Sequence, residues 1–137
     1  MEFPLNFGLN KTGLLLILTS GKLKNLCFLI DTGSTHNLIF KFVYDHLKNE
    51  FELLEEVRKT MGIEGNYVES NTVQATLSFE GEEYSTTFTL IDNSTAVAQV
   101  QEETGVQIHG VLGIDFLIKY GWTIDFQNCT IRSNRRV

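Results

Sequence analysis

Apolar residues occur in short runs that are separated by glycines and small polar residues. The first two runs cover residues 13–19 and 23–30, with Ser20-Gly21-Lys22 between them. Runs of this length around a glycine-containing turn are typical of a β-hairpin. The second run leads into Asp31-Thr32-Gly33-Ser34-Thr35, a stretch of small polar residues. The pattern therefore predicts that Asp31 lies on a loop at the end of a strand.

A helical period follows this loop. Apolar residues recur at spacings of three and four, at Phe40, Val43, Leu47, Phe51 and Leu54. This spacing places them on one face of a helix, and we predict a helix over residues 41–49.

Extended segments are expected in the middle of the chain. Residues 53–59 and 67–79 flank the glycine-containing stretch 60–66, and residues 84–91 run back after a turn at Gly81. Apolar residues alternate strictly in the second of these segments, at Val73, Ala75, Leu77 and Phe79. This alternation is typical of a strand with one buried face. We therefore expect the stretch 60–66 to be the tip of a long hairpin.

The last third of the chain combines an irregular stretch with two clearer elements. Residues 92–106 are polar and poorly patterned, and we predict a surface loop or a short helical turn there. Residues 108–121 are predicted to form a buried strand, a glycine and a short helix that Gly121 terminates. Residues 122–126 and 129–132 predict a last hairpin, turned by Gln127-Asn128. The elements together predict one mostly β domain over residues 1–137, with one or two short helices.

Charge and hydropathy exclude several classes of partner. The chain has 11 basic and 17 acidic residues and a formal net charge of -6. Phosphate binding needs a net or clustered positive face, so we expect no nucleic-acid partner. No apolar run approaches the roughly 20 residues of a membrane-spanning helix, and the run at 14–18 is too short for a signal peptide. We therefore expect no membrane partner and favour a cytoplasmic location.

No metal site or cofactor is predicted. His36, His46 and His109 are scattered, without the spacing of metal ligands. Cys27 lies in an apolar run and is interpreted as a buried small hydrophobic residue, although pairing with Cys129 is possible in principle.

Asp31-Thr32-Gly33 is a weak motif by itself, since it should occur by chance in about three per cent of chains of this length. Three further features accompany it in a fixed order. They are the apolar strand 28–30, the hairpin tip Gly62-Ile63-Glu64-Gly65, and the segment Val111-Leu112-Gly113-Ile114-Asp115-Phe116-Leu117. An accidental occurrence of all of them together is improbable.

With these motifs, residues 12–132 resemble the retropepsin-like aspartic proteases, the family of retroviral proteases and of protease domains in some cellular and bacterial proteins. Residues 29–34 match the motif hydrophobic-hydrophobic-Asp-Thr-Gly-Ser, and residues 111–117 match hydrophobic-Leu-Gly-x-Asp-x-Leu. The predicted helix after the loop makes the chain more similar to cellular and bacterial members than to retroviral ones. The resemblance implies a closed or partly open β-barrel and an aspartic endopeptidase.

Two carboxylates that share one proton can hydrolyse a peptide bond, because one deprotonates the attacking water while the other protonates the carbonyl oxygen. This chain contains only one Asp-Thr-Gly. Asp125 lacks a following glycine loop, and Asp115 is interpreted as a helix cap or a structural hydrogen-bonding group. The catalytic pair is therefore expected to be Asp31 from each of two identical chains, in a two-fold homodimer that cleaves a peptide or protein substrate.

The resemblance also implies roles for neighbouring residues. Thr32 would hydrogen-bond across the dimer axis, and Gly33 would let the substrate backbone come close. The Ser34 hydroxyl would donate to Asp31 and favour its ionised form, which would shift activity towards acid. Gly62, Ile63, Glu64 and Gly65 would form a flap that closes over an extended peptide. Two Glu64 carboxylates near one axis would repel each other at neutral pH and again favour activity in acid.

Two other classes of function stay open. A retropepsin-like module could bind peptide or dimerise without turnover, because the unpatterned residues 93–107 could obstruct the cleft and Glu64 is unusual at a flap tip. A plain β-barrel interaction module with a chance Asp-Thr-Gly is the third possibility. Thr35 and His36 stand where the retroviral pattern often has two acidic residues, so the subsite preferences of that branch do not carry over.

Overall fold

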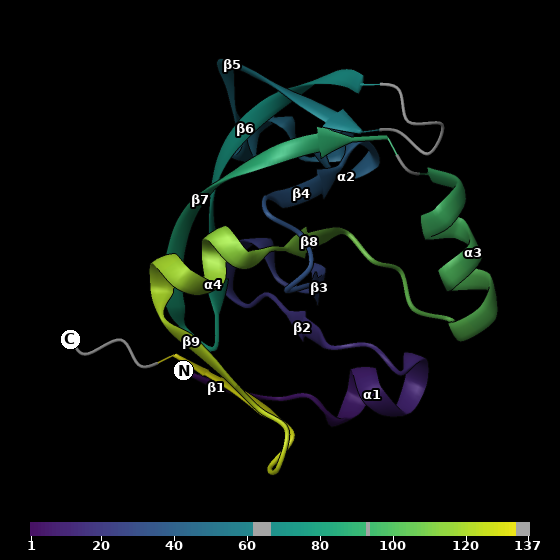
Figure 1. The fold of residues 1–137 in the computed structure, drawn as a ribbon, viewed down its shortest axis with the longest axis vertical. Helices are drawn as coiled ribbons and strands as arrows, with labels where there is room; N and C mark the ends of the chain where they lie inside the picture. Colours follow the sequence, from purple (N-terminus) through teal and green to yellow (C-terminus); the bar gives the residue numbers. More distant parts are fainter. Residues whose placement is uncertain (62–66, 93, 134–137) are drawn as a thin grey trace.

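A curved sheet of seven strands is the main feature of the computed structural model, which describes residues 1–61, 67–92 and 94–133 (Figure 1). The strands follow the order β2-β3-β8-β4-β7-β6-β5. Their bounds are β2 (Leu16–Leu18), β3 (Cys27–Ile30), β4 (Asn37–Phe40), β5 (Glu52–Met61), β6 (Tyr67–Phe79), β7 (Glu82–Ile91) and β8 (Gly110–Leu112). Of these seven strands, β8 comes last in the chain, but it lies in the interior of the sheet, parallel to β3 and antiparallel to β4.

A second sheet of three strands joins the N-terminal and C-terminal segments. Its order is β1-β10-β9, with β1 at Glu2–Pro4, β9 at Trp122–Asp125 and β10 at Thr130–Ser133. β1 pairs with β10 in antiparallel register, and the Leu5 N–H donates to the Cys129 carbonyl at 2.8 Å. The hairpin predicted at the end of the chain is therefore confirmed, and it forms a sheet with a segment from the other end.

Alternating apolar residues give the central strands two buried faces. On β3, Phe28 and Ile30 belong to the main core, while Cys27 and Leu29 belong to a second apolar cluster. β2, β4 and β8 divide their side chains in the same way. Successive side chains of a strand point to opposite faces, so this part of the sheet is covered on both sides.

The helix α3 (Ser94–Thr104) covers the second cluster, and it corrects our prediction of a loop or a short helical turn over residues 92–106. Val97 is buried there, in the cluster that includes Cys27 and Val111, while most other side chains of α3 are exposed. Val97 is the buried residue among the described side chains of α3, and one such residue gives almost no apolar period, which explains why the sequence did not predict a helix. Figure 1 shows α3 on the side of the molecule opposite to α4.

The chain has more helix than the one or two short helices that we predicted. The predicted helices are confirmed as α2 (Lys41–His46) and α4 (Ile114–Tyr120). Gly121 ends α4 with φ of 62°, as expected. α2 ends before residue 49 because a 3-10 turn, η2 (Lys48–Glu50), follows it. In addition to α3, the unpredicted helix α1 (Asn6–Thr12) occupies a segment without an apolar period and lies against β2, where a Cβ on Gly8 would be 2.8 Å from the Leu16 Cβ.

The seven-stranded sheet curls but does not close among the described residues. β2 and β5 are its two edges, and the contact that draws the sheet together is an isolated bridge between Ser20 and Ser78. The closed form of the predicted barrel is therefore wrong. The physical reason is that β2 has only three residues, while β5 and β6 continue away from the core as long paired strands.

Aromatic side chains hold α4 against β7 and β9. The ring of Phe116 on α4 lies 4.8 Å from that of Trp122 and 5.6 Å from that of Tyr84, between centroids. Such edge-on and tilted ring pairs add stability beyond the burial of their area. α4 begins two residues after β8, so these contacts also fix the end of β8 in the sheet. Among the described residues, no helix has the length and apolar character needed to span a membrane.

Candidate active site

Asp31 lies immediately after β3, as the sequence predicts. Ile30 is paired with Leu112 of β8, and the Asp31 N–H continues this ladder by donating to the Leu112 carbonyl at 3.0 Å. The Asp31 side chain is half-buried. The backbone of this residue is thus fixed by the sheet, while its carboxylate keeps access to solvent.

The loop after Asp31 folds back on the aspartate. The Ser34 N–H donates to the Asp31 carbonyl at 3.1 Å, and the Gly33 N–H donates to Oδ1 of the Asp31 carboxylate at 2.9 Å. Thr32 and Gly33 are exposed, and the Thr32 hydroxyl has no hydrogen bond to a described residue. A Cβ on Gly33 would lie 3.2 Å from Oδ1 of Asp31, so glycine leaves room beside the carboxylate. These contacts orient the carboxylate and leave the tip of the loop open.

Ser34 does not contact the Asp31 carboxylate in the way that we predicted. Its hydroxyl donates to the carbonyl of His36 at 2.8 Å. This bond closes a short turn within the loop, which is a common use of serine where a neighbouring carbonyl is in reach. The expected donation from Ser34 to Asp31 is therefore wrong for the single chain.

The start of α4 holds the second half of the loop. The Ile114 N–H donates to the Ser34 carbonyl at 2.8 Å, and the Asp115 N–H donates to the Thr35 carbonyl at 3.2 Å. Gly113 packs so closely that a Cβ there would lie 2.5 Å from the Ser34 oxygen and 2.6 Å from the His36 oxygen. The Gly113 of the sequence motif is thus needed because two carbonyls of the Asp31 loop occupy the space of a side chain.

Two side chains reinforce this junction. Asn37 is buried, accepts the Gly113 N–H on Oδ1 at 2.9 Å, and donates through Nδ2 to the Thr86 hydroxyl at 2.9 Å. Nδ1 of His36 donates to Oδ2 of Asp115 at 2.8 Å. The N-cap residue of α4 is Gly113, so Asp115 is the structural hydrogen-bonding group of our two interpretations and not the helix cap.

Sequence reasoning did not identify Asn37 or the His36–Asp115 pair. The His36–Asp115 pair joins positions 79 residues apart in the chain. The contact exists because β8 pairs with both β3 and β4, which places the start of α4 beside the Asp31 loop. The available signal was a polar residue, Asn37, at the beginning of an apolar run.

The remaining aspartates are arranged differently. The Asp125 carboxylate accepts hydrogen bonds from the Asn128 side-chain amide at 2.9 Å and from the Asn128 N–H at 3.0 Å. Both bonds lower the pKa of Asp125, and the bond from the side chain has the larger effect. Asp45 pairs with Lys41 on α2 at 2.8 Å. Asp92 is exposed just after β7. Within the described part of the chain, Asp31 is thus the aspartate that a glycine loop presents to solvent.

The flap residues Gly62, Ile63, Glu64 and Gly65 lie outside the described residues. The segments that lead to them are described, and they agree with the prediction of two extended arms. β5 and β6 pair in antiparallel register from Glu52↔Gln74 to Met61↔Tyr67, with one irregularity between Leu54 and Val57.

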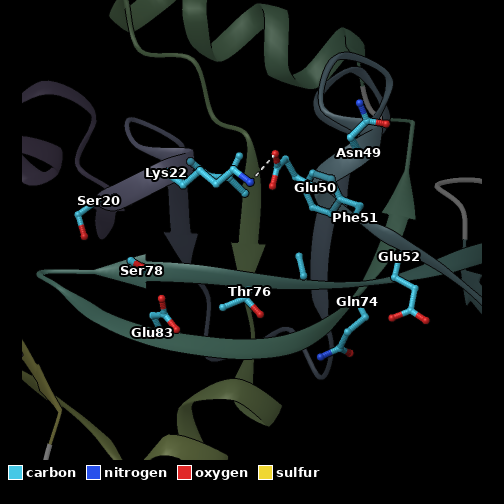
Figure 2. A pocket seen from close by; sticks show the side chains of 13 residues that line it. Ser20, Lys22, Asn49, Glu50, Phe51, Glu52, Gln74, Thr76, Ser78 and Glu83 are labelled. Atoms are coloured by element: carbon cyan, nitrogen blue, oxygen red, sulfur yellow. Dashed lines mark ion pairs between the residues drawn. The ribbon is translucent and has the colours of Figure 1, made fainter.

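A cavity of about 510 Å³ lies elsewhere on the molecule. Its walls are the turn η1 (Gly21–Leu23), the segment 49–52 and the second half of β6. Figure 2 shows Lys22 and Glu50 pointing towards each other, and their charged atoms are 3.2 Å apart. No residue of the Asp31 loop lines this cavity, so it is not part of the candidate active site. In the described segments, no group of three or more histidine, cysteine, aspartate or glutamate side chains is arranged to bind a metal ion.

Comparison with known proteins supports the fold. No protein-family model and no curated protein sequence matches the chain. A solved structure does match: the retroviral protease-like domain of Ddi1 from Leishmania major, with a TM-score of 0.63 over 90% of each chain. The chain has a retropepsin-like fold. The two sequences are only 12% identical, so the likeness extends to the fold alone. In this retropepsin-like fold, β3 and β8 fix the backbone of Asp31, and α4 holds the second half of the loop that follows it.

Proposed function

We propose that the protein is an aspartic endopeptidase that acts as a homodimer and cleaves extended polypeptide segments. The observation that carries this proposal is the position of Asp31. Its backbone is fixed by β8, its carboxylate accepts a hydrogen bond from the loop amide of Gly33, and the loop tip is open to solvent. A retropepsin-like fold that presents an Asp-Thr-Gly-Ser loop in this way favours hydrolysis of peptides over the other functions that we considered.

A second chain is needed because one chain offers one such carboxylate. Asp115 is engaged by His36 and Asp125 by Asn128, so neither is available beside Asp31 as a second acid or base. A two-fold axis at the exposed tip of the loop would bring two copies of Thr32 and Gly33 together and place the two Asp31 carboxylates near each other. Oligomeric state is therefore part of the proposal.

The chemistry would follow from the sharing of one proton by the two carboxylates. Like charges a few ångströms apart resist ionising together, so one Asp31 would hold a proton while its counterpart is ionised. The ionised carboxylate would remove a proton from the attacking water, and the protonated one would donate to the carbonyl oxygen of the scissile peptide. The pair β5–β6 would place the flap residues 62–65 over the substrate, which would bind as an extended strand.

The test compares Asp31→Asn with the wild-type protein and with Asp45→Asn. Each is incubated with a denatured protein substrate between pH 4 and pH 7, with and without pepstatin, and new peptide termini are counted. We expect cleavage by the wild type and by Asp45→Asn, inhibition by pepstatin, and loss of cleavage in Asp31→Asn. Equal cleavage by Asp31→Asn and the wild type would refute the assignment.

The wild type and Asp31→Asn could both form dimers while neither cleaves any substrate. In that case the alternative of a catalytically silent peptide-binding or dimerisation module replaces the proposal. The insert that motivated this alternative contains α3, whose Val97 packs on the second apolar cluster. This packing gives the insert a structural role in covering the sheet.

A further inference from the structure

The loop that carries Asp31 is fixed firmly at its two ends and lightly in between. At the first end the Asp31 N–H is bonded to β8, and at the second end Asn37 is buried at the start of β4. Thr32, Gly33, Thr35 and His36 between them are exposed. The shape of this exposed stretch therefore depends on a small number of contacts outside the loop.

Those contacts come from the first residues of α4. Two are backbone hydrogen bonds, from Ile114 to Ser34 and from Asp115 to Thr35. The third is the hydrogen bond from Nδ1 of His36 to Oδ2 of Asp115 at 2.8 Å. Among the described residues, this pair is the side-chain link between loop residues 32–36 and α4. It restrains the last exposed residue of the loop.

Solvent exposure limits what this pair does for global stability. Its side chains keep 46% and 50% of their accessible surface. Side-chain pairs with this exposure, charged or not, contribute little to unfolding free energy, because water competes for the contact and ordering two side chains has an entropic cost. A displacement of about 1 Å at a reacting group, in contrast, can lower a rate about a hundredfold.

We propose that His36 and Asp115 are a positioning pair, which holds the Asp31 loop in the geometry that its chemistry needs. This inference rests on the proposed function. Removal of either side chain should let His36 and the exposed loop residues beside it move and so lower kcat, while the fold persists because the backbone bonds to Ser34 and Thr35 and the buried Asn37 remain. In this proposal the pair acts through the loop and not directly on the substrate, so KM should change less than kcat.

The Lys41–Asp45 pair on α2 is a matched control. Its charged atoms are also 2.8 Å apart, and its side chains keep 57% and 41% of their accessible surface. It lies on a different helix from the Asp31 loop and its support. A general effect of losing one half-exposed side-chain pair would appear equally in Lys41→Ala and His36→Ala.

The experiment measures kcat, KM and melting temperature for His36→Ala, Asp115→Ala, the double variant, Asp115→Asn and Lys41→Ala. We expect kcat to fall about tenfold in each single alanine variant and no further in the double variant, because both substitutions break one contact. Melting temperatures should stay within about 3 °C of the wild type. Asp115→Asn keeps an oxygen that accepts from His36 and should recover most of kcat, and Lys41→Ala should match the wild type. A kcat within twofold of the wild type in His36→Ala, or a double variant that multiplies the two single losses, would overturn the proposal.

A second measurement keeps the test independent of catalysis. Amide hydrogen exchange at Gly33 and Ser34 reports whether the loop opens, since both N–H groups donate to Asp31. We expect faster exchange at these two amides in His36→Ala and no change in Lys41→Ala. Unchanged exchange would overturn the positioning role even in an active enzyme. An inactive wild type that shows the expected exchange difference would instead refute the proposed function and leave the loop contact supported.

Discussion

The close contact between Gly113 and the Asp31 loop predicts a specific effect of adding one methyl group. A Cβ at this position would lie 2.5 Å from the Ser34 oxygen and 2.6 Å from the His36 oxygen, whereas Cβ atoms essentially never come within 3.0 Å of another atom. The difference between 3.0 and 2.5 Å means that at least one carbonyl of the loop must move by about 0.5 Å. Overpacking of this kind costs about 1–3 kcal/mol of unfolding free energy.

The expected change in melting temperature follows from the length of the chain. An unfolding entropy of about 2.1 cal/mol/K per residue gives roughly 0.3 kcal/mol/K for this protein, so Gly113→Ala should melt about 3–10 °C below the wild type. Because the displaced carbonyls belong to the Asp31 loop, peptidase activity measured well below the melting temperature should also fall, by about tenfold or more.

The variant Gly121→Ala separates the loss of stability from the loss of peptidase activity. Gly121 has φ of 62°, and a Cβ added there would meet no atom within 4 Å, so alanine introduces backbone strain of about 1–2 kcal/mol without a steric clash. It lies at the far end of α4 from the loop. We expect its melting temperature to fall by a comparable amount with activity kept within twofold. Wild-type melting temperature and activity in Gly113→Ala, measured by circular dichroism and peptide cleavage, would refute the reasoning.

Three further predictions concern buried and half-buried groups. Burial lowers the pKa of His109, whose Nδ1 accepts the Cys27 N–H at 2.9 Å. A histidine with a folded pKa below its unfolded value of about 6.5 has no effect above that pH and destabilises the fold as the pH drops below it. Urea unfolding at pH 7.5 and pH 5 should therefore show a smaller loss of stability in His109→Gln than in the wild type, and equal losses would contradict this. Asn37→Ala leaves the Gly113 N–H and a threonine hydroxyl without their buried partner, and urea unfolding should show a loss of about 2–3 kcal/mol; a loss below about 1 kcal/mol would be inconsistent with the contacts. Burial raises the pKa of the Cys27 thiol to about 11, so a thiol reagent at pH 8 should modify Cys129 alone in the native protein and both cysteines after denaturation. Rapid modification of both thiols in the native state would count against this burial.

Local patterns predicted the elements whose residues repeat with a clear period. The strict alternation of residues 73–79 identified β6, and the spacing of Val43 and its apolar neighbours identified α2. α3 escaped prediction because it packs through Val97 and the partly buried Val100 on a cluster assembled from distant strands. The sequence also could not show that the sheet stays open among the described residues, because this depends on how β2 and β5 curve in space and not on the pattern within either strand.

The candidate site likewise contains residues that local motifs predicted and contacts that only the folded chain brings together. Asp31, Gly33 and Gly113 belong to local motifs, and the structure places all three at one junction. The role expected for Ser34 was wrong, because a hydroxyl takes whichever acceptor the folded loop brings within reach, and here this is the His36 carbonyl. Contacts between residues far apart in the chain, such as His36 with Asp115, depend on the pairing of β8 with both β3 and β4 and leave no periodic signal.

The central claim is that two chains each contribute one Asp31 to a single catalytic pair. It is tested most directly by mixing the wild-type protein with a ninefold excess of Asp31→Asn, after unfolding and refolding them together, and measuring peptidase activity per wild-type chain. If the pair is shared and the chains associate at random, about one wild-type chain in ten finds a wild-type partner, and activity per wild-type chain falls to about a tenth. Activity per wild-type chain that is unchanged by the excess of Asp31→Asn would contradict the account.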